Sequence, residues 1–148
     1  MEINPNAPVA AREETLIDAR PEGVWAILTD IDRWPEWQPG VSRARLEGPL
    51  ALGSVFRWRA NGLSIRSILR DVDPTTRVSW VGKALGTRAV HVWSLTVEGT
   101  QTVVHTEESF EGWLPRLIRR AMQKNLEKAL RGSLESLKQR AEAGQREG

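Results

Sequence analysis

The chain has 148 residues, a formal net charge of +2 and no cysteine, and its aromatic side chains are seven Trp and two Phe. A chain of this length typically forms one domain around one core. The lack of cysteine excludes disulfides and thiolate metal sites, and two histidines are too few for a three-histidine zinc centre. We therefore expect one domain packed largely by indole rings, with no metal and no cofactor.

The N-terminal part of the chain predicts one strand followed by two short helices. Residues 1–8 contain two prolines and two asparagines and are expected to be a disordered lead-in. A strand is predicted over residues 9–19. Pro21 is expected to begin a helix, because its fixed φ suits the first helical turn. Two further prolines allow only a short helix or a turn over residues 30–39.

The middle of the chain contains six segments typical of short antiparallel strands, each followed by a turn signal. The strongest turn signal is Asn61-Gly62, because both residues tolerate the positive φ of a two-residue hairpin turn. The predicted strands cover residues 41–46, 54–60, 63–72, 77–81, 88–97 and 102–110.

The C-terminal part predicts one long helix over residues 115–141, interrupted at most by Gly132, and a polar tail over residues 142–148. Apolar residues recur every three or four positions and form one stripe. The same helix is basic, with eight Lys and Arg against two Glu. The stripe consists of Leu114, Ile118, Met122, Leu126, Leu130, Leu134 and Leu137. The order of elements predicts an α+β fold with helices on one face of an antiparallel sheet.

Five motifs resemble the SRPBCC (START-like, Bet v 1-like) superfamily, most closely its polyketide cyclase/dehydrase branch. They are residues 18–25 (DARPEGVW), 30–37 (DIDRWPEW), 56–58 (FRW), 73–80 (DPTTRVSW) and 107–112 (EESFEG). The resemblance covers one domain over residues 9–141. It implies a helix-grip fold, in which a curved seven-stranded antiparallel sheet wraps around a long C-terminal helix and encloses an apolar cavity. It also implies two short helices after the first strand.

Strand parity predicts which side chains face this cavity. If Val97 pairs with Thr102, then His91 lies opposite Glu108 on the same face as Trp93. We interpret His91 and Glu108 as a polar pair at one end of the cavity, serving structure, proton-transfer catalysis or ligand recognition. The residues predicted to contact a ligand are Phe56, Trp58, Val78, Trp80, Trp93, Leu95, Val104, Thr106, Phe110, Ile118, Met122 and Leu126. The alternative for the aromatic members is a filled core.

Other groups of residues have simpler interpretations. Trp34 and Trp37 are expected to plug one end of the cavity. Asp30, Asp32 and Glu36 lack the spacing of a calcium loop and are expected to cap a helix or face solvent. Three arginines at positions 116, 119 and 120 lie where the helix dipole disfavours cations, so they could meet acidic side chains, an acidic partner or lipid headgroups, or remain solvated.

These patterns favour binding of a hydrophobic small molecule (a lipid, a polyketide or an aromatic compound). One alternative is a cyclase/dehydratase-type enzyme that uses His91 and Glu108 for proton transfer, and another is a co-chaperone-like protein-interaction module. The sequence leaves open whether any reaction is catalysed. No nucleic acid partner is expected, whereas weak contact of the basic helix with an anionic membrane is an option. We expect a cytoplasmic location, since the first residues lack a signal-peptide pattern. The protein is expected to be a monomer or a homodimer.

Overall fold

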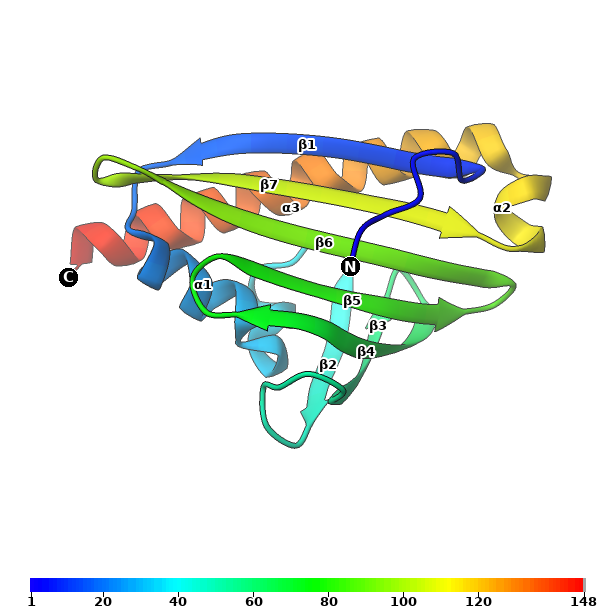
Figure 1. The fold of residues 1–148 in the computed structure, drawn as a ribbon, viewed down its shortest axis with the longest axis horizontal. Helices are drawn as coiled ribbons and strands as arrows, with labels where there is room; N and C mark the ends of the chain where they lie inside the picture. The colour runs from blue at the N-terminus through cyan, green and yellow to red at the C-terminus, as the bar shows by residue number, and fades with distance from the viewer. Residues whose placement is uncertain (148) are drawn as a thin grey trace.

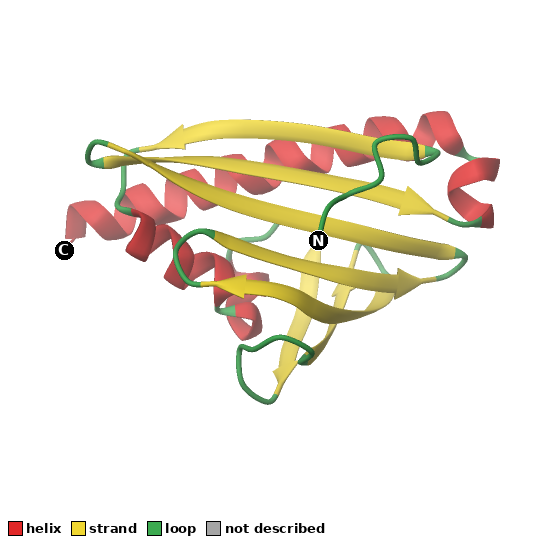
Figure 2. Ribbon diagram, in the orientation of Figure 1, coloured by secondary structure: helices red, strands yellow, loops and turns green. Residues whose placement is uncertain are grey.

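A seven-stranded antiparallel sheet forms the body of the protein in the computed structural model, which describes residues 1–147 (Figures 1 and 2). The strand order is β1-β7-β6-β5-β4-β3-β2. The strands are β1 (Val9–Ile17), β2 (Val41–Glu47), β3 (Val55–Ala60), β4 (Leu63–Asp73), β5 (Arg77–Ala84), β6 (Thr87–Glu98) and β7 (Gln101–Glu111). The helices are α1 (Pro21–Thr29), the 3₁₀ helix η1 (Ile31–Glu36), α2 (Trp113–Leu117) and α3 (Arg119–Glu147). The predicted α+β class, the helix-grip arrangement and the two short helices after β1 are confirmed.

Two turn predictions are confirmed in detail. Asn61 and Gly62 have φ values of 50° and 80°, so the β3–β4 hairpin uses the positive φ that these residues tolerate. In the β6–β7 hairpin, Val97 lies opposite Thr102 and His91 lies opposite Glu108, as the parity argument predicts. The correct register brings the polar pair onto one face of the sheet.

The prediction of a single C-terminal helix is wrong in one respect, because α2 and α3 are separate helices. The chain leaves helical geometry at Ile118, where φ is −120° and ψ is 42°. The Leu114 N–H donates a 3.3 Å hydrogen bond to the carbonyl of Gly86, so α2 is tied to the β5–β6 turn. α3 instead follows β1 and β7 along the sheet (Figure 1). Gly132 lies inside α3 without interrupting it, and α3 continues through residues assigned to the polar tail.

The N-terminal lead-in, which the sequence predicts to be disordered, lies across the outer face of the sheet. Ile3 is buried there against Val81, Val90 and Val92. The ammonium group of Met1 lies 3.0 Å from a carboxylate oxygen of Asp71. These contacts explain why outward-facing valines of β5 and β6 are buried.

Aromatic packing fills the inner face beside η1. The Trp34 ring lies within 5.2–5.4 Å of the ring centroids of Phe56, Trp58 and Trp80. Its indole N–H donates a 2.9 Å hydrogen bond to the carbonyl of Leu28. Trp34 and Trp37 are both buried in this core, so their packing role is confirmed.

Gly112, between β7 and α2, is expected to tolerate no side chain. Its φ of 126° and ψ of −178° lie in a region that only glycine populates readily. An added Cβ would lie 2.2 Å from the carbonyl oxygen of Gly86, which belongs to the rigid backbone of the β5–β6 turn. We predict that Gly112→Ala lowers the free energy of unfolding in urea by at least about 2 kcal/mol. Gly23→Ala, at a helical position with no atom within 4 Å of the new Cβ, is the control and should be neutral or stabilising.

Candidate functional site

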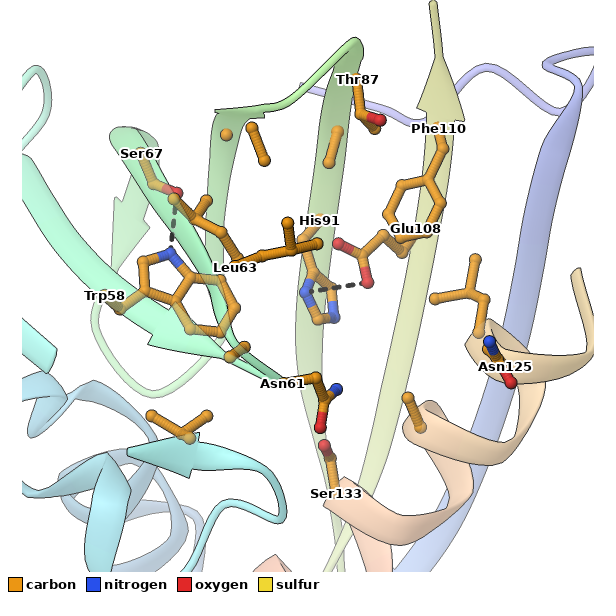
Figure 3. Close-up of a pocket in the computed structure, with 18 of the residues that line it drawn as sticks. Trp58, Asn61, Leu63, Ser67, Thr87, His91, Glu108, Phe110, Asn125 and Ser133 are labelled. Carbon is orange, nitrogen blue, oxygen red and sulfur yellow. Dashed lines mark hydrogen bonds and ion pairs between the residues drawn. The ribbon is translucent and has the colours of Figure 1, made fainter. Parts of the chain in front are cut away.

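A cavity of about 320 Å³ lies between the inner face of the sheet and the first half of α3 (Figure 3). Its walls are mostly apolar and come from β2 to β7, from residues 38–39 before β2, from Leu114 of α2, and from Met122, Leu126 and Leu130 of α3. Several lining residues are solvent-exposed, among them Leu63 and Asn125, so the cavity opens between the β3–β4 hairpin and α3. A volume of this size falls at the lower end of the range for small-molecule sites.

The cavity is open here because the inward-facing side chains of this half of the sheet are small. Gly82 lies opposite Ser67 on one side and Ala89 on the other, and Ala84 and Ala60 continue the pattern toward the same end. In the other half, inward-facing positions hold large side chains that pack against the end of α3 and α1. Those large residues include Trp93, Leu95 and Val104. Large side chains therefore hold the sheet and α3 apart at one end, and the space between them remains unfilled at the other end.

The sequence predictions identified the correct face of the sheet but only part of the cavity wall. The predicted ligand-contacting residues that line the cavity are Trp58, Trp80, Phe110, Met122 and Leu126. Those that lie in the closed core are Phe56, Val78, Trp93, Leu95 and Val104. Thr106 is buried beneath His91, and Ile118 is 43% exposed at the α2–α3 break. The small lining residues Gly82 and Ala89 were not predicted. Each lies two positions from a residue of the predicted face, Trp80 on β5 and His91 on β6, so strand parity combined with side-chain volume could have identified them.

His91 and Glu108 lie side by side on β6 and β7, at the wall of the cavity (Figure 3). The His91 Nδ1 atom is 3.5 Å from Glu108 Oε1, and its Nε2 atom is 2.8 Å from the hydroxyl oxygen of Thr106. The imidazole also packs between Trp80 and Trp93, with ring-centroid distances of 4.9 Å and 5.3 Å. Apolar rings and strand neighbours thus hold this pair away from bulk water.

Burial keeps both members of the pair uncharged at neutral pH. It lowers the pKa of the His91 imidazole from 6.5 to about 3, because desolvation disfavours the imidazolium. It raises the pKa of the Glu108 carboxyl from 4.5 to about 8, because desolvation disfavours the carboxylate. At pH 7 the site therefore holds a neutral imidazole beside a carboxylic acid.

Glu108 is the member of the pair that can meet a ligand. The His91 Nδ1 atom is inaccessible to solvent and its Nε2 atom is occupied by Thr106. One carboxyl oxygen of Glu108 is directed at His91, and the other turns toward the cavity (Figure 3). A Thr106 hydroxyl that donates to Nε2 leaves the imidazole proton on Nδ1, where it faces Glu108 Oε1. The acidic proton of Glu108 can then be donated into the cavity.

The carboxylates near η1 have structural partners. Asp32 Oδ1 accepts a 2.7 Å hydrogen bond from the Leu46 N–H, and Glu36 lies 2.7 Å from Arg140. Asp30 pairs with Arg33 at 3.6 Å and makes no capping hydrogen bond, so the predicted cap is absent while the surface role is confirmed. Across residues 1–147, no helix is long and apolar enough to cross a membrane.

Solved structures with the same fold come from several bacteria. A hypothetical protein from Helicobacter pylori superposes with a TM-score of 0.83 at 14% identity, covering 94% of this chain and 91% of that one. A START superfamily protein from Mycobacterium smegmatis gives 0.65 at 16% identity, covering 86% and 98%. The di-domain aromatase/cyclase StfQ from the steffimycin biosynthetic pathway gives 0.77 at 19% identity, covering 91% of this chain and 51% of StfQ. These identities support the shared fold alone.

No curated protein matches the sequence. A family model described as polyketide cyclase / dehydrase and lipid transport matches residues 8–142, which is nearly the whole domain. The motifs, the helix-grip fold and this match agree, and the chain belongs to the polyketide cyclase/dehydrase and lipid transport family.

Proposed function

We propose that this protein binds a small, largely apolar molecule that carries a hydrogen-bond acceptor, such as a ketone or ester carbonyl. The observation that carries the proposal is Glu108, a carboxyl group with a pKa raised to about 8 that faces a mostly apolar cavity. A carboxylic acid kept neutral at pH 7 donates a hydrogen bond to a ligand oxygen without the cost of burying a charge. The cavity volume favours a compact molecule.

The cavity walls support recognition of a flat apolar body. The Trp58 indole N–H already donates a 3.1 Å hydrogen bond to Ser67, so this ring offers its apolar surface to a ligand. Trp80 is held by Trp34, Phe56 and His91 and also lines the cavity. A ligand can thus gain apolar contact along the walls and one directional hydrogen bond at Glu108.

The carbonyl preference can be tested with two probes of similar shape, 2-acetylnaphthalene and 2-ethylnaphthalene, titrated against tryptophan fluorescence. At pH 6 we expect the ketone to bind about tenfold more tightly, the value of roughly one added hydrogen bond. At pH 9 the preference should fall to about twofold or less, because most of Glu108 is then ionised and has no proton to donate. Glu108→Gln should keep the preference at both pH values, since its amide still donates. Equal binding of the probes to the unaltered protein at pH 6 would contradict the proposal.

Filling the cavity should abolish binding of both probes. Ala89 lies opposite Gly82 and Phe110 on the inner face, so Ala89→Leu places three additional carbons into the open volume. We expect at least a tenfold loss of affinity for either naphthalene with little change in the unfolding transition. Ala26→Leu, on the exposed side of α1, is the matched control and should bind both probes as the unaltered protein does. Unchanged binding by Ala89→Leu would place the binding site elsewhere.

A carboxyl group whose pKa of about 8 lies near neutral pH also favours a second candidate, the dehydration of a β-hydroxy ketone. In its ionised form, the cavity-facing oxygen of Glu108 accepts the proton α to the ketone and then delivers it to the departing hydroxyl, which releases water and regenerates the carboxylate. His91 would act as a positioning residue, because neither of its nitrogens faces the cavity. Formation of the conjugated ketone, followed by its absorbance, should then disappear in Glu108→Gln while probe binding remains.

A further inference from the structure

Four large apolar side chains are exposed at the end of the molecule where α2 meets the β5–β6 turn (Figure 1). Trp113 lies over this turn, since a Cβ built on Gly86 would be 2.4 Å from its ring. The four residues, called here the apolar tip, are Leu85 (65% exposed), Trp113 (60%), Leu117 (72%) and Ile118 (43%). An exposed apolar group of this kind typically marks a contact surface for a partner or a membrane.

One side of the apolar tip is basic. Residues 113–126 contain four cationic side chains, all exposed, and no carboxylate; they are Arg116, Arg119, Arg120 and Lys124. The acidic side chains that the sequence suggested as their partners are engaged elsewhere. Glu107 pairs with Arg12, Glu108 contacts His91, and Glu111 pairs with Arg88. Arg119 donates a 2.9 Å hydrogen bond to the carbonyl of Pro8.

The other side of the apolar tip is basic as well. A row of cationic residues crosses the outer face of five neighbouring strands, each directly opposite the next: Arg45, Arg57, Arg66, Lys83 and Arg88. Like charges directly opposite each other in a sheet are destabilising. Glu47 and Glu111 pair with only Arg57 and Arg88. The row ends at the turn that carries Leu85, so positive charge flanks the tip on both sides.

We propose that this end of the molecule docks on an anionic lipid bilayer, with the apolar tip in the interfacial region and the flanking cations on the headgroups. A bilayer surface matches both features at once, because Trp and aliphatic side chains partition into the interface while each Lys or Arg near anionic lipid contributes about 1 kcal/mol. A nucleic acid would match the charge but offers no apolar phase for Leu117 and Ile118. The strength of such binding scales with the apolar area buried plus the electrostatic attraction to anionic lipid, so the two features act together.

Docking in this orientation brings the α2 end of the ligand cavity close to the membrane. α2 supplies Leu114 to the cavity wall, and Thr87 at the start of β6 lines the same end. Trp113 and Leu117 of the same short helix face outward. The proposal rests on these surface features and not on the proposed ligand, so it can hold or fail independently of Glu108.

The test is flotation of the purified protein with vesicles of phosphatidylcholine alone or of phosphatidylcholine mixed with phosphatidylglycerol. We expect binding to the mixed vesicles, weakened by salt, and at least tenfold weaker binding to phosphatidylcholine. Leu117→Asp should lower binding to the mixed vesicles at least tenfold. Its matched control is Leu52→Asp in the β2–β3 loop, where the leucine is equally exposed at 71%. The double variant R116Q/R120Q should also lose binding, whereas R20Q/R70Q removes the same charge elsewhere on the surface and should retain it.

Quenching by brominated lipid tests insertion separately. Trp113 is exposed, whereas the other six tryptophans are buried or half-buried, so vesicle-dependent quenching should disappear in Trp113→Phe. Absence of binding to the mixed vesicles would overturn the proposal and point instead to a protein partner. Equal loss in Leu117→Asp and Leu52→Asp, or quenching that survives in Trp113→Phe, would overturn the assignment of the apolar tip.

Discussion

Replacing Trp34 with alanine is expected to lower the free energy of unfolding by about 3–5 kcal/mol, the usual cost of removing a buried aromatic side chain. Trp34 is fully buried and contacts three aromatic rings on β3 and β5. Nothing beside it can refill the space, because Phe56, Trp58 and Trp80 are each held in a strand. The substitution also leaves the Leu28 carbonyl without the indole donor. Urea unfolding followed by circular dichroism measures the loss.

The same substitution should affect the cavity, since Trp58 and Trp80 form part of its wall. We expect Trp34→Ala to weaken naphthalene binding through greater freedom of these two rings, even at temperatures where the variant is folded. Trp113→Ala is the control, because this side chain is 60% exposed, and it should change stability by less than about 1 kcal/mol. A cost for Trp34→Ala as small as that of Trp113→Ala would show that η1 is not anchored through this ring.

The fold was predictable because local signals agree with one another along the chain. Positive-φ turn residues such as Asn61-Gly62 define a hairpin, and the β6–β7 turn then determines which side chains lie opposite each other. Since the side-chain period of a strand is two, one correct turn was enough to place His91 beside Glu108. The family resemblance supplied the remaining arrangement of sheet and helix.

The open half of the inner face was not predicted, because parity tells which face a side chain occupies but not how closely the opposing helix approaches it. That distance depends on side-chain volumes summed across strands, from Gly82 and Ala89 at one end to Trp93 and Leu95 at the other. The break at Ile118 depends on a hydrogen bond between α2 and a distant turn. Both features arise from contacts between segments remote in sequence, which periodicity within one segment does not report.

Stability is expected to fall by about 2 kcal/mol between pH 6.5 and pH 8 through the ionisation of Glu108. The folded-state pKa of this carboxyl is raised to about 8 against an ordinary value of 4.5, so the folded protein holds a proton that the unfolded chain releases. The contribution of this protonated carboxyl to the free energy of unfolding is full below pH 4.5 and is lost as the pH rises to 8. The His91 pKa is lowered to about 3, so its contribution rises with pH from 3 to 6.5. Between pH 4.5 and 6.5 the stability lost through Glu108 is offset by the stability gained through His91. The free energy of unfolding therefore stays nearly constant in this range and declines above pH 6.5.

Glu108→Gln isolates this effect, because glutamine has the same shape and does not ionise. We expect the variant to lose the decline between pH 6.5 and 8 in urea unfolding, whereas Glu107→Gln on the opposite face should retain it. A decline that persists unchanged in Glu108→Gln would show that another group is responsible. A ligand that accepts a hydrogen bond from the Glu108 carboxyl group must bind the acid form more tightly than the carboxylate. Linkage then requires that the bound ligand raise the pKa of Glu108 further. Saturating 2-acetylnaphthalene should therefore extend the decline to higher pH without changing where it begins, whereas 2-ethylnaphthalene should stabilise the protein with a smaller extension of the decline.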